Sequence, residues 1–126
     1  MERKLKILAV DDDAINLMLI KSMLKKCPDV CEVVEAKNGL EAINKITETE
    51  DIDLILLDIK MPIMNGMEFM DNVSTIPNKR EIPIIVLTTD ESMKYKSFDG
   101  GAFDFLVKPI RKNELYEKIE KVKNLL

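Results

Sequence analysis

The sequence contains no histidine and no tryptophan, and only two of its 126 residues are cysteines. Without histidine the chain cannot form a phosphohistidine, and it cannot use the Ser-His or Cys-His pairs of nucleophilic hydrolases. Cys27 and Cys31 flank a turn at Pro28-Asp29, and no histidine is present to complete a zinc site with them. We therefore expect two free structural thiols, and any phosphoryl group that binds covalently would have to arrive from outside onto a carboxylate.

Long apolar runs are also missing, so nothing in the chain predicts a membrane span. The charged start, Met1 to Lys4, is followed by an apolar stretch of only strand length, which excludes a typical secretory leader. A formal net charge of −4 argues against direct binding to nucleic acid. With 46% hydrophobic and 33% charged residues, the sequence is typical of one globular domain, which we expect to cover residues 1–126 in the cytoplasm.

Five short apolar segments alternate with five segments of helical periodicity. Residues Leu54 to Leu57 are four apolar residues in a row, as in a strand buried on both faces of a parallel sheet. The expected strands are 6–10, 31–35, 54–57, 83–87 and 103–107, and the expected helices are 14–26, 40–47, 67–74, 91–98 and 112–125. This alternation predicts a flavodoxin-like (βα)5 α/β fold with a five-stranded parallel sheet in the order 2-1-3-4-5 and helices on both faces.

The fourth helical segment is the weakest of the five. Residues 91–98 have a ragged apolar pattern and are followed by Gly100-Gly101, so we expect this segment to be the most mobile. The last segment, 112–125, has a regular apolar stripe instead.

Polar side chains follow four of the expected strands. Three consecutive aspartates, Asp11 to Asp13, follow the first strand, and Asp58 follows the third. Thr88 and Lys108 follow the fourth and fifth strands. Because the carboxyl ends of parallel strands meet at one edge of a sheet, these groups should lie close together. Packed carboxylates repel one another unless a cation neutralises them, and hard oxygen ligands suit Mg²⁺.

These motifs together resemble the receiver domain of two-component response regulators, of the single-domain chemotaxis-regulator type. The similarity covers essentially the whole chain, with the motifs in the family's order and spacing. The residues that carry it are Val10-Asp11-Asp12, Leu57-Asp58, Met61-Pro62, Gly66, Leu87-Thr88 and Lys108-Pro109.

The resemblance implies a role for each of the acidic positions. Asp58 corresponds to the family's phosphoacceptor, and a carboxylate can form an acyl phosphate by attack on phosphorus. Asp11 and Asp12 correspond to the acidic pair that holds Mg²⁺ together with Asp58. The backbone carbonyl of Lys60 corresponds to a further metal ligand.

The remaining site positions follow from the same resemblance. Lys108 corresponds to the lysine that contacts a phosphoryl oxygen, and its bond to Pro109 is expected to be cis. Thr88 corresponds to the hydroxyl that binds the phosphoryl group. Phe105 occupies the family's aromatic switch position, where many relatives carry tyrosine, and a plain core role is the alternative there.

Some positions depart from the family pattern or modulate it. Thr89 stands where relatives usually have a small residue, and Gly100 where alanine is common. Asp13 makes a third acid, which we interpret as a helix N-cap. Lys60 and Asp90 flank the phosphoryl position in the family and influence how readily water attacks it.

The implied function is phosphorelay signal transduction without enzymatic activity beyond phosphorylation and dephosphorylation of the domain itself. The phosphodonor would be a histidine kinase or a histidine phosphotransfer protein. A downstream protein would read the surface of Glu91–Phe105 and the last helix. We expect a monomer or a phosphorylation-dependent dimer, and no effector domain after residue 126.

Two other interpretations remain open. Three acids after a first strand also fit haloacid-dehalogenase-type phosphatases that use Mg²⁺, in which Asp11 would be the nucleophile. The short chain and the unexplained Lys108-Pro109 argue against that interpretation. A binding module of the same fold that is never phosphorylated is the second, and the intact set of Asp58, Thr88 and Lys108 argues against it.

Overall fold

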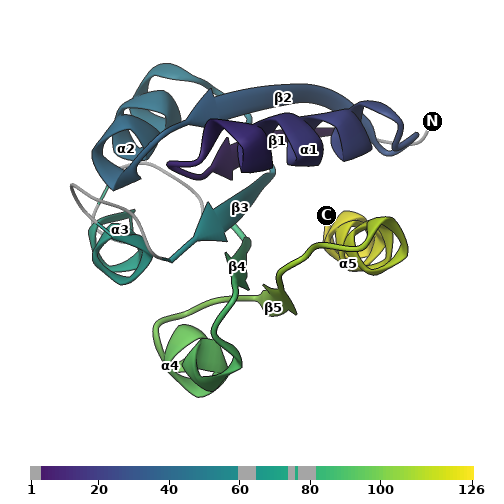
Figure 1. The fold of residues 1–126 in the computed structure, drawn as a ribbon. Coiled ribbons are helices and arrows are strands. Elements are labelled where there is room, and N and C mark those ends of the chain that lie inside the picture. The colour runs from purple at the N-terminus through teal and green to yellow at the C-terminus, as the bar shows by residue number, and fades with distance from the viewer. Residues whose placement is uncertain (1–3, 60–64, 74–75, 77–81) are drawn as a thin grey trace.

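The structure, a computed structural model, describes residues 4–59, 65–73, 76 and 82–126 (Figure 1). Five strands alternate with helices along the chain. The elements are β1 (Leu5–Val10), α1 (Ala14–Lys25), β2 (Val30–Ala36), α2 (Gly39–Glu48), β3 (Leu54–Asp58), α3 (Gly66–Val73), β4 (Ile84–Thr88), the 3₁₀ turn η1 (Glu91–Met93), α4 (Lys94–Asp99), β5 (Asp104–Val107) and α5 (Lys112–Leu125).

All neighbouring strands pair in parallel, in the order β2-β1-β3-β4-β5. This confirms the predicted flavodoxin-like sheet. The central strand β3 is buried along its whole length, as its unbroken apolar run predicted. Because β3 pairs with β1 and β4 at the same height, with Val10 opposite Leu57 and Asp58 opposite Leu87, the carboxyl ends of these strands form one edge.

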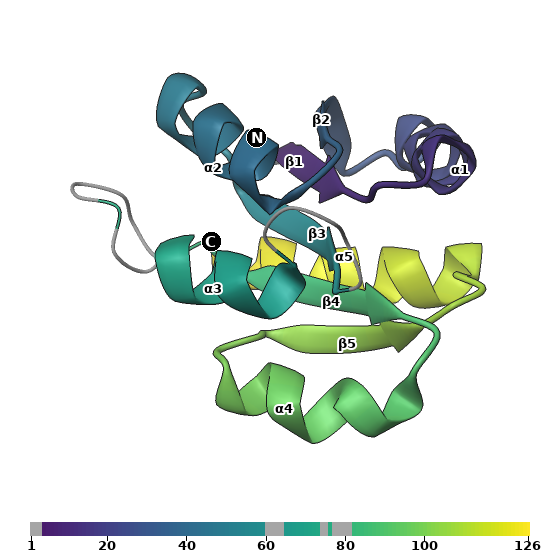
Figure 2. The same ribbon diagram turned by 60° about the vertical axis from the view of Figure 1, so that its left-hand side comes forward.

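Two hydrophobic layers cover the two faces of the sheet. The side chains of a strand alternate between the faces, so Leu54 and Leu56 pack in one layer and Ile55 and Leu57 in the other. The first layer holds the buried residues of α1 and α5, and the second holds those of α2 and α3 (Figures 1 and 2).

Helix α1 begins after a side-chain cap that positions the first functional residues. The Asp13 carboxylate accepts hydrogen bonds from the backbone N–H of Ile15 (2.9 Å) and Asn16 (3.4 Å), which confirms the predicted N-cap. Leu17, Ile20 and Leu24 are the buried residues of the helix, and their i, i+3, i+7 spacing places them on one face. The capped start of α1 therefore fixes the turn that carries the acidic residues after β1.

The predicted helix at 91–98 is divided in two. Asp90 caps the 3₁₀ turn η1, and the six-residue α4 follows, with Ser97 as its buried residue. The last helix extends over the predicted 112–125 and buries Leu115, Ile119 and Val122.

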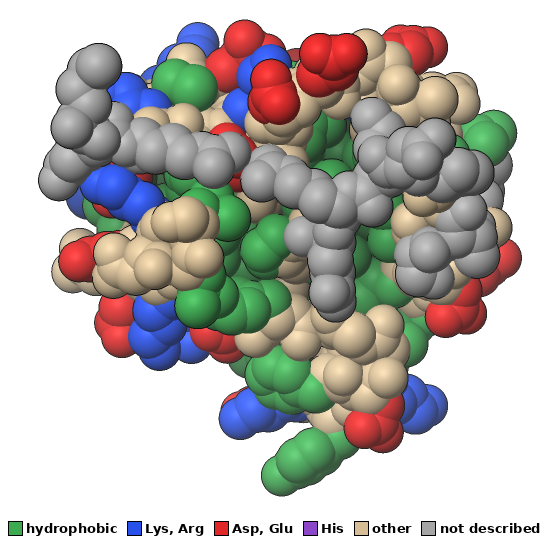
Figure 3. Space-filling model, turned by 180° about the vertical axis from the view of Figure 1, so that it is seen from behind, with side chains coloured by type: hydrophobic (Ala, Val, Ile, Leu, Met, Phe, Trp, Pro, Cys, Tyr) green, Lys and Arg blue, Asp and Glu red, His purple; other side chains and the backbone are tan. Residues whose placement is uncertain are grey.

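The surface and the thiols agree with a mixed-charge globular domain. Figure 3 shows acidic and basic side chains interspersed around one face, with hydrophobic side chains between them. Cys27 is buried, Cys31 is exposed, and both are free, as predicted. Within the described residues, none of the helices is both long enough and apolar enough to cross a membrane.

Candidate functional site

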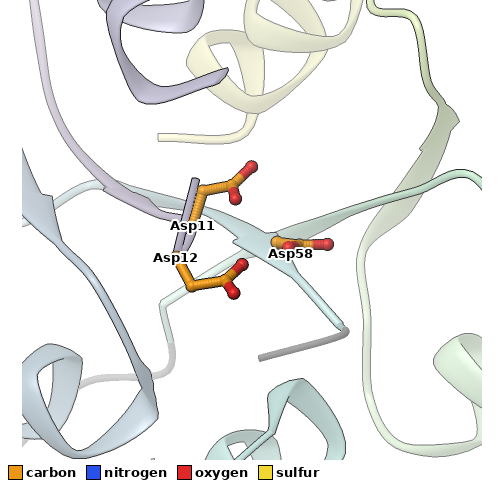
Figure 4. Close-up of side chains that lie close together, drawn as sticks. All are labelled: Asp11, Asp12 and Asp58. Carbon is orange, nitrogen blue, oxygen red and sulfur yellow. The ribbon is translucent and has the colours of Figure 1, made fainter. Parts of the chain in front are cut away.

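The polar residues singled out in the sequence meet at the carboxyl edge of the sheet. Asp11 comes directly after β1, and Asp58 is the last residue of β3. Thr88 ends β4, and Lys108 follows β5. Figure 4 shows the side chains of Asp11, Asp12 and Asp58 close together where β1 and β3 end. Parallel pairing thus brings together residues that lie up to 97 positions apart in the sequence.

Three carboxylates at this edge form an acidic cluster. One ligand oxygen from each of Asp11, Asp12 and Asp58 lies within 4.8 Å of the others. Asp11 and Asp58 are buried and Asp12 is exposed, so the cluster has an open side toward solvent. Three hard oxygen donors that repel one another at this spacing suit a small divalent cation such as Mg²⁺. The predicted fourth ligand, the carbonyl of Lys60, lies outside the described residues, as do Met61 and Pro62.

The ammonium group of Lys108 lies against the two buried carboxylates. The Nζ atom of Lys108 is 2.8 Å from Oδ2 of Asp11 and 3.5 Å from Oδ1 of Asp58. The Lys108–Pro109 peptide bond is cis, and the Lys108 backbone N–H donates to the Thr88 carbonyl (2.8 Å). The start of the loop after β5 is thereby held beside β4, with the Lys108 side chain in the acidic cluster.

The charges of the cluster shift the pKa values of two of its members. Burial and then the neighbouring charge of Asp11 raise the pKa of Asp58 to about 6, against a lowering effect of Lys108. Burial alone would lower the pKa of Lys108, but its hydrogen bond to Asp11 and the charges of Asp58 and Asp11 outweigh burial and raise it. Lys108 is therefore a permanent cation near neutral pH, whereas Asp58 gains or loses its proton there.

The residues of β4 and β5 surround the cluster on one side. Thr88 is buried, and its hydroxyl oxygen accepts a hydrogen bond from the Asp90 backbone N–H (3.1 Å). Thr89 is exposed. The Asp90 carboxylate accepts hydrogen bonds from the backbone N–H of Ser92 (3.0 Å) and its hydroxyl (2.5 Å). Phe105 is 7% exposed and packs in the layer of α2 and α3.

Two positioning contacts were not predicted from the sequence. The Asp13 backbone N–H donates to Oδ1 of Asp11 (2.9 Å), which fixes the orientation of that carboxylate. A Cβ atom on Gly66 would lie 2.7 Å from Cα of Ile59 and 2.9 Å from the carbonyl oxygen of Asp58, so only glycine allows α3 to approach the end of β3 this closely. Asn65-Gly66 is a typical turn dipeptide, but the close approach depends on tertiary packing.

The fold and the acidic edge define a class of small parallel α/β domains with a charged site where the strands end. The sequence model of the response regulator receiver domain matches residues 7–120. The chain therefore belongs to the response regulator receiver domain family of two-component systems, as the motifs predicted, and the phosphatase interpretation is not favoured.

Solved structures support the same assignment. The chemotaxis protein CheY4 of Vibrio cholerae is 31% identical with a TM-score of 0.84, over 94% of this chain and 98% of that chain. The response regulator domain of Thermotoga maritima CheB is 32% identical with a TM-score of 0.84, over 97% and 98% of the two chains.

Curated relatives are longer than this chain. The two-component response regulator-like protein APRR7 of Arabidopsis thaliana is 35% identical over 116 residues, which are 90% of this chain but 16% of that protein. A protein-glutamate methylesterase/protein-glutamine glutaminase of Desulfotalea psychrophila is 36% identical over 92% of this chain and 32% of its own length. The likeness to these proteins thus concerns their receiver portions.

Proposed function

We propose that Asp58 accepts a phosphoryl group from a phosphohistidine of a histidine kinase or a histidine phosphotransfer protein. The observation that supports this is the position of the Asp58 carboxylate, which ends the central strand beside the Lys108 ammonium group and the carboxylates of Asp11 and Asp12. A carboxylate oxygen of Asp58 forms the new bond to phosphorus while the phosphorus–nitrogen bond of the donor breaks. The electron pair of that bond stays on the imidazole of the donor.

Asp11, Asp12 and Asp58 would hold Mg²⁺, with the backbone carbonyl of Lys60 as a further ligand. When bound there, Mg²⁺ would supply positive charge for the oxygens of the transferring group. Lys108 contributes a second positive charge for a phosphoryl oxygen. The hydroxyl of Thr88 donates a hydrogen bond to the group once it is attached.

The output is a change of surface and not the turnover of a substrate. The chain would catalyse only its own phosphorylation and dephosphorylation, in the cytoplasm, and a downstream protein would read Glu91–Phe105 and α5. Phe105 lacks the hydroxyl of tyrosine, so any inward rotation gains only apolar burial. Met93, just before α4, and Ala102, just after it, pack in the same layer as Phe105, which supports a small movement of Phe105 coupled to α4.

The proposal is tested by intact-mass analysis after incubation with acetyl phosphate and Mg²⁺. The wild type should gain one phosphoryl group, and Asp58→Asn should gain none. Asp12→Ala should label poorly because the cation loses a ligand. Asp13→Asn is the matched control, because it also removes a negative charge after β1 while asparagine preserves the N-cap. Equal labelling of Asp58→Asn, or a label located on Asp11, would contradict the assignment.

Lys60 lies outside the described residues, but its charge is opposite to that of Asp90. We also propose that these two charges pair across the mouth of the site and slow the attack of water on the acyl phosphate. A carboxylate that is paired is a poorer base for activating water. An exposed pair contributes only ~0–1 kcal/mol, and each ~1.4 kcal/mol on the barrier is tenfold in rate.

The lifetime of the acyl phosphate distinguishes pairing from its alternative. Asp90→Asn removes the charge but leaves an oxygen that can cap Ser92, so it is a cleaner variant than alanine. Pairing predicts that Lys60→Ala and Asp90→Asn each accelerate phosphate loss and that the double variant adds little. Slower loss in Asp90→Asn would mean that Asp90 assists the attacking water.

A further inference from the structure

A groove lies at one edge of the sheet, outside the acidic cluster. The edge strand β5 forms its floor, with α4 on one side of the strand and α5 on the other (Figures 1 and 2). The groove has a volume of about 340 Å³. Val107, the last residue of β5, lines it and is 36% exposed. The floor of the groove can therefore pack against a hydrocarbon chain.

The walls of this groove carry an excess of negative charge. Four carboxylates and two ammonium groups line it, which belong to Glu91, Asp104, Glu114, Glu117, Lys94 and Lys118. Asp104 and Lys118 neutralise each other at 3.0 Å. The other four groups are exposed, and three of them are carboxylates. Within the part of the chain that the structure describes, none of these three carboxylates forms an ion pair. The groove is therefore suited to a cationic ligand.

Lysine and arginine side chains match both the floor and the walls. Their aliphatic stems pack on apolar surface, while the charged ends stay in water beside a carboxylate. Glu91 belongs to η1, and Glu114 and Glu117 belong to α5, so the carboxylates stand on both sides of β5. A second copy of this chain suits the groove less well, because a symmetric contact places the acidic groove against itself.

We propose that this groove binds a basic segment of the downstream protein, whose lysine or arginine side chains lie over β5 and end at Glu91, Glu114 and Glu117. The inference rests on the proposed function, because it takes this protein to be the one that reads the phosphorylated domain. Phe105 also lines the groove, and η1 forms part of one wall. A movement of Phe105 and α4 would therefore change the affinity for the basic segment.

The test measures the binding of fluorescein-labelled hexa-arginine by fluorescence anisotropy in about 0.1 M salt, where charges more than about 10 Å apart are largely screened. The wild type should bind this probe, and Glu114→Gln/Glu117→Gln should bind it at least about fivefold more weakly, because two contacts with the probe lose their charge. Glu48→Gln/Glu50→Gln is the matched control, since it changes the net charge equally at two exposed residues outside the groove. Its affinity should change less than about twofold.

A second measurement locates the probe on the wild type. Hexa-arginine should shift the amide resonances of residues 104–107 and 114–118 more than those of α2. Absence of binding, equal weakening in the two double variants, or the largest shifts outside the groove overturns the inference.

The labelling of Asp58 by acetyl phosphate separates the two proposals. If Asp58 is labelled and the groove fails these tests, the inference is wrong and the proposed function stands. If Asp58 is not labelled but Glu114→Gln/Glu117→Gln still weakens binding, the proposed function is wrong and the groove remains a site for a basic segment.

Discussion

The two helices that flank β5 are attached to the domain in different ways. Helix α5 buries Leu115, Ile119 and Val122 in the layer that it shares with α1. Its Tyr116 hydroxyl donates to the Met23 carbonyl of α1 at 2.6 Å. Fixed contacts along its length thus join α5 to the sheet and to a second helix.

Helix α4 has much less to hold it. The buried residue of its six is Ser97, whose hydroxyl donates to the Met93 carbonyl of the same segment (2.7 Å). Tyr95 is 79% exposed and Phe98 is 39% exposed, so the aromatic residues of the helix contribute little to the core. A segment with few buried contacts opens or shifts at a low free-energy cost. If the proposed phosphorylation of Asp58 moves one of these helices, the difference predicts that α4 shifts and that α5 stays in place.

This comparison predicts that the largest loss of stability follows the substitution of a core residue of α5. Ile119→Ala should lower the free energy of unfolding by about 2–5 kcal/mol, because a fully buried isoleucine leaves a cavity. Tyr95→Ala on α4 should change it by less than about 0.5 kcal/mol. Urea denaturation followed by circular dichroism measures both. A loss of similar size in Tyr95→Ala would show that α4 supports the fold as strongly as α5.

The second largest effect concerns the charge of Asp58, which makes the free energy of unfolding depend on pH. The folded pKa of about 6 lies above the ordinary value of 3.8, so the folded state holds this proton more tightly than the unfolded chain. The resulting stabilisation is present below pH about 4 and is lost as pH rises through about 6. In buffer without Mg²⁺, Asp58→Asn should therefore be more stable than the wild type at pH about 7.5, by roughly 1–3 kcal/mol.

The advantage of Asp58→Asn should shrink as the pH falls and disappear near pH about 4. Thermal or urea unfolding across this range measures it, with Asp13→Asn as a control that leaves the buried cluster unchanged. A constant difference between Asp58→Asn and the wild type at all pH values would mean that burial does not perturb Asp58.

Much of this architecture could be predicted from the sequence because the signals are local. The apolar run of Leu54 to Leu57 is long enough for one strand, and its polar end marks the edge of the sheet. The apolar stripe of residues 112–125 is regular, whereas that of residues 91–98 is irregular. These patterns predicted that α5 would be better packed than α4. Parallel topology then brought Asp11 and Asp58 to the same edge.

The contacts that orient the site could not be predicted, because they depend on side-chain packing between distant segments. The sequence predicts that a lysine lies near the acidic residues. It does not predict that Lys108 lies closer to Asp11 than to Asp58. The helical periodicity of residues 67–74 does not by itself single out Phe69, which is completely buried in the structure. A switch at Phe105 would require two positions of its side chain, and a sequence pattern does not distinguish a residue with two positions from one with a single position.

Hydrogen exchange measures directly how the mobility of each helix responds to phosphorylation. With acetyl phosphate and Mg²⁺, exchange should change most in Glu91–Phe105, by about tenfold or ~1.4 kcal/mol. Amides of α5 should change by less than about twofold, because its buried residues stay in the core. Mass spectrometry of peptic fragments measures both segments, and Asp58→Asn under the same conditions is the control. Changes limited to residues 11–13 and to the residues around Asp58 would contradict a role for α4.

The smallest expected effect on stability is that of replacing Gly100, at the end of α4, with alanine. This change would make α4 more stable and thus more similar to α5. Gly100 has φ −77° and ψ −3°, which alanine adopts without strain. An added Cβ would lie 3.1 Å from Cε of Met67 and 3.2 Å from Cε of Met70, both ends of flexible side chains that can move by a few tenths of an ångström. It would also lie 3.3 Å from the Lys96 carbonyl oxygen.

Because alanine has less backbone freedom in the unfolded chain, Gly100→Ala should stabilise the domain by about 0.4–1 kcal/mol and slow exchange in α4 more than in α5. Gly101→Ala is the matched control: no atom lies within 4 Å of its added Cβ, but φ is +104°, which strains alanine. That variant should be destabilised by about 1 kcal/mol or more. If Gly100→Ala is destabilised as well, the contact of α4 with Met67 and Met70 is rigid, and the helix is held more firmly than its few buried residues indicate.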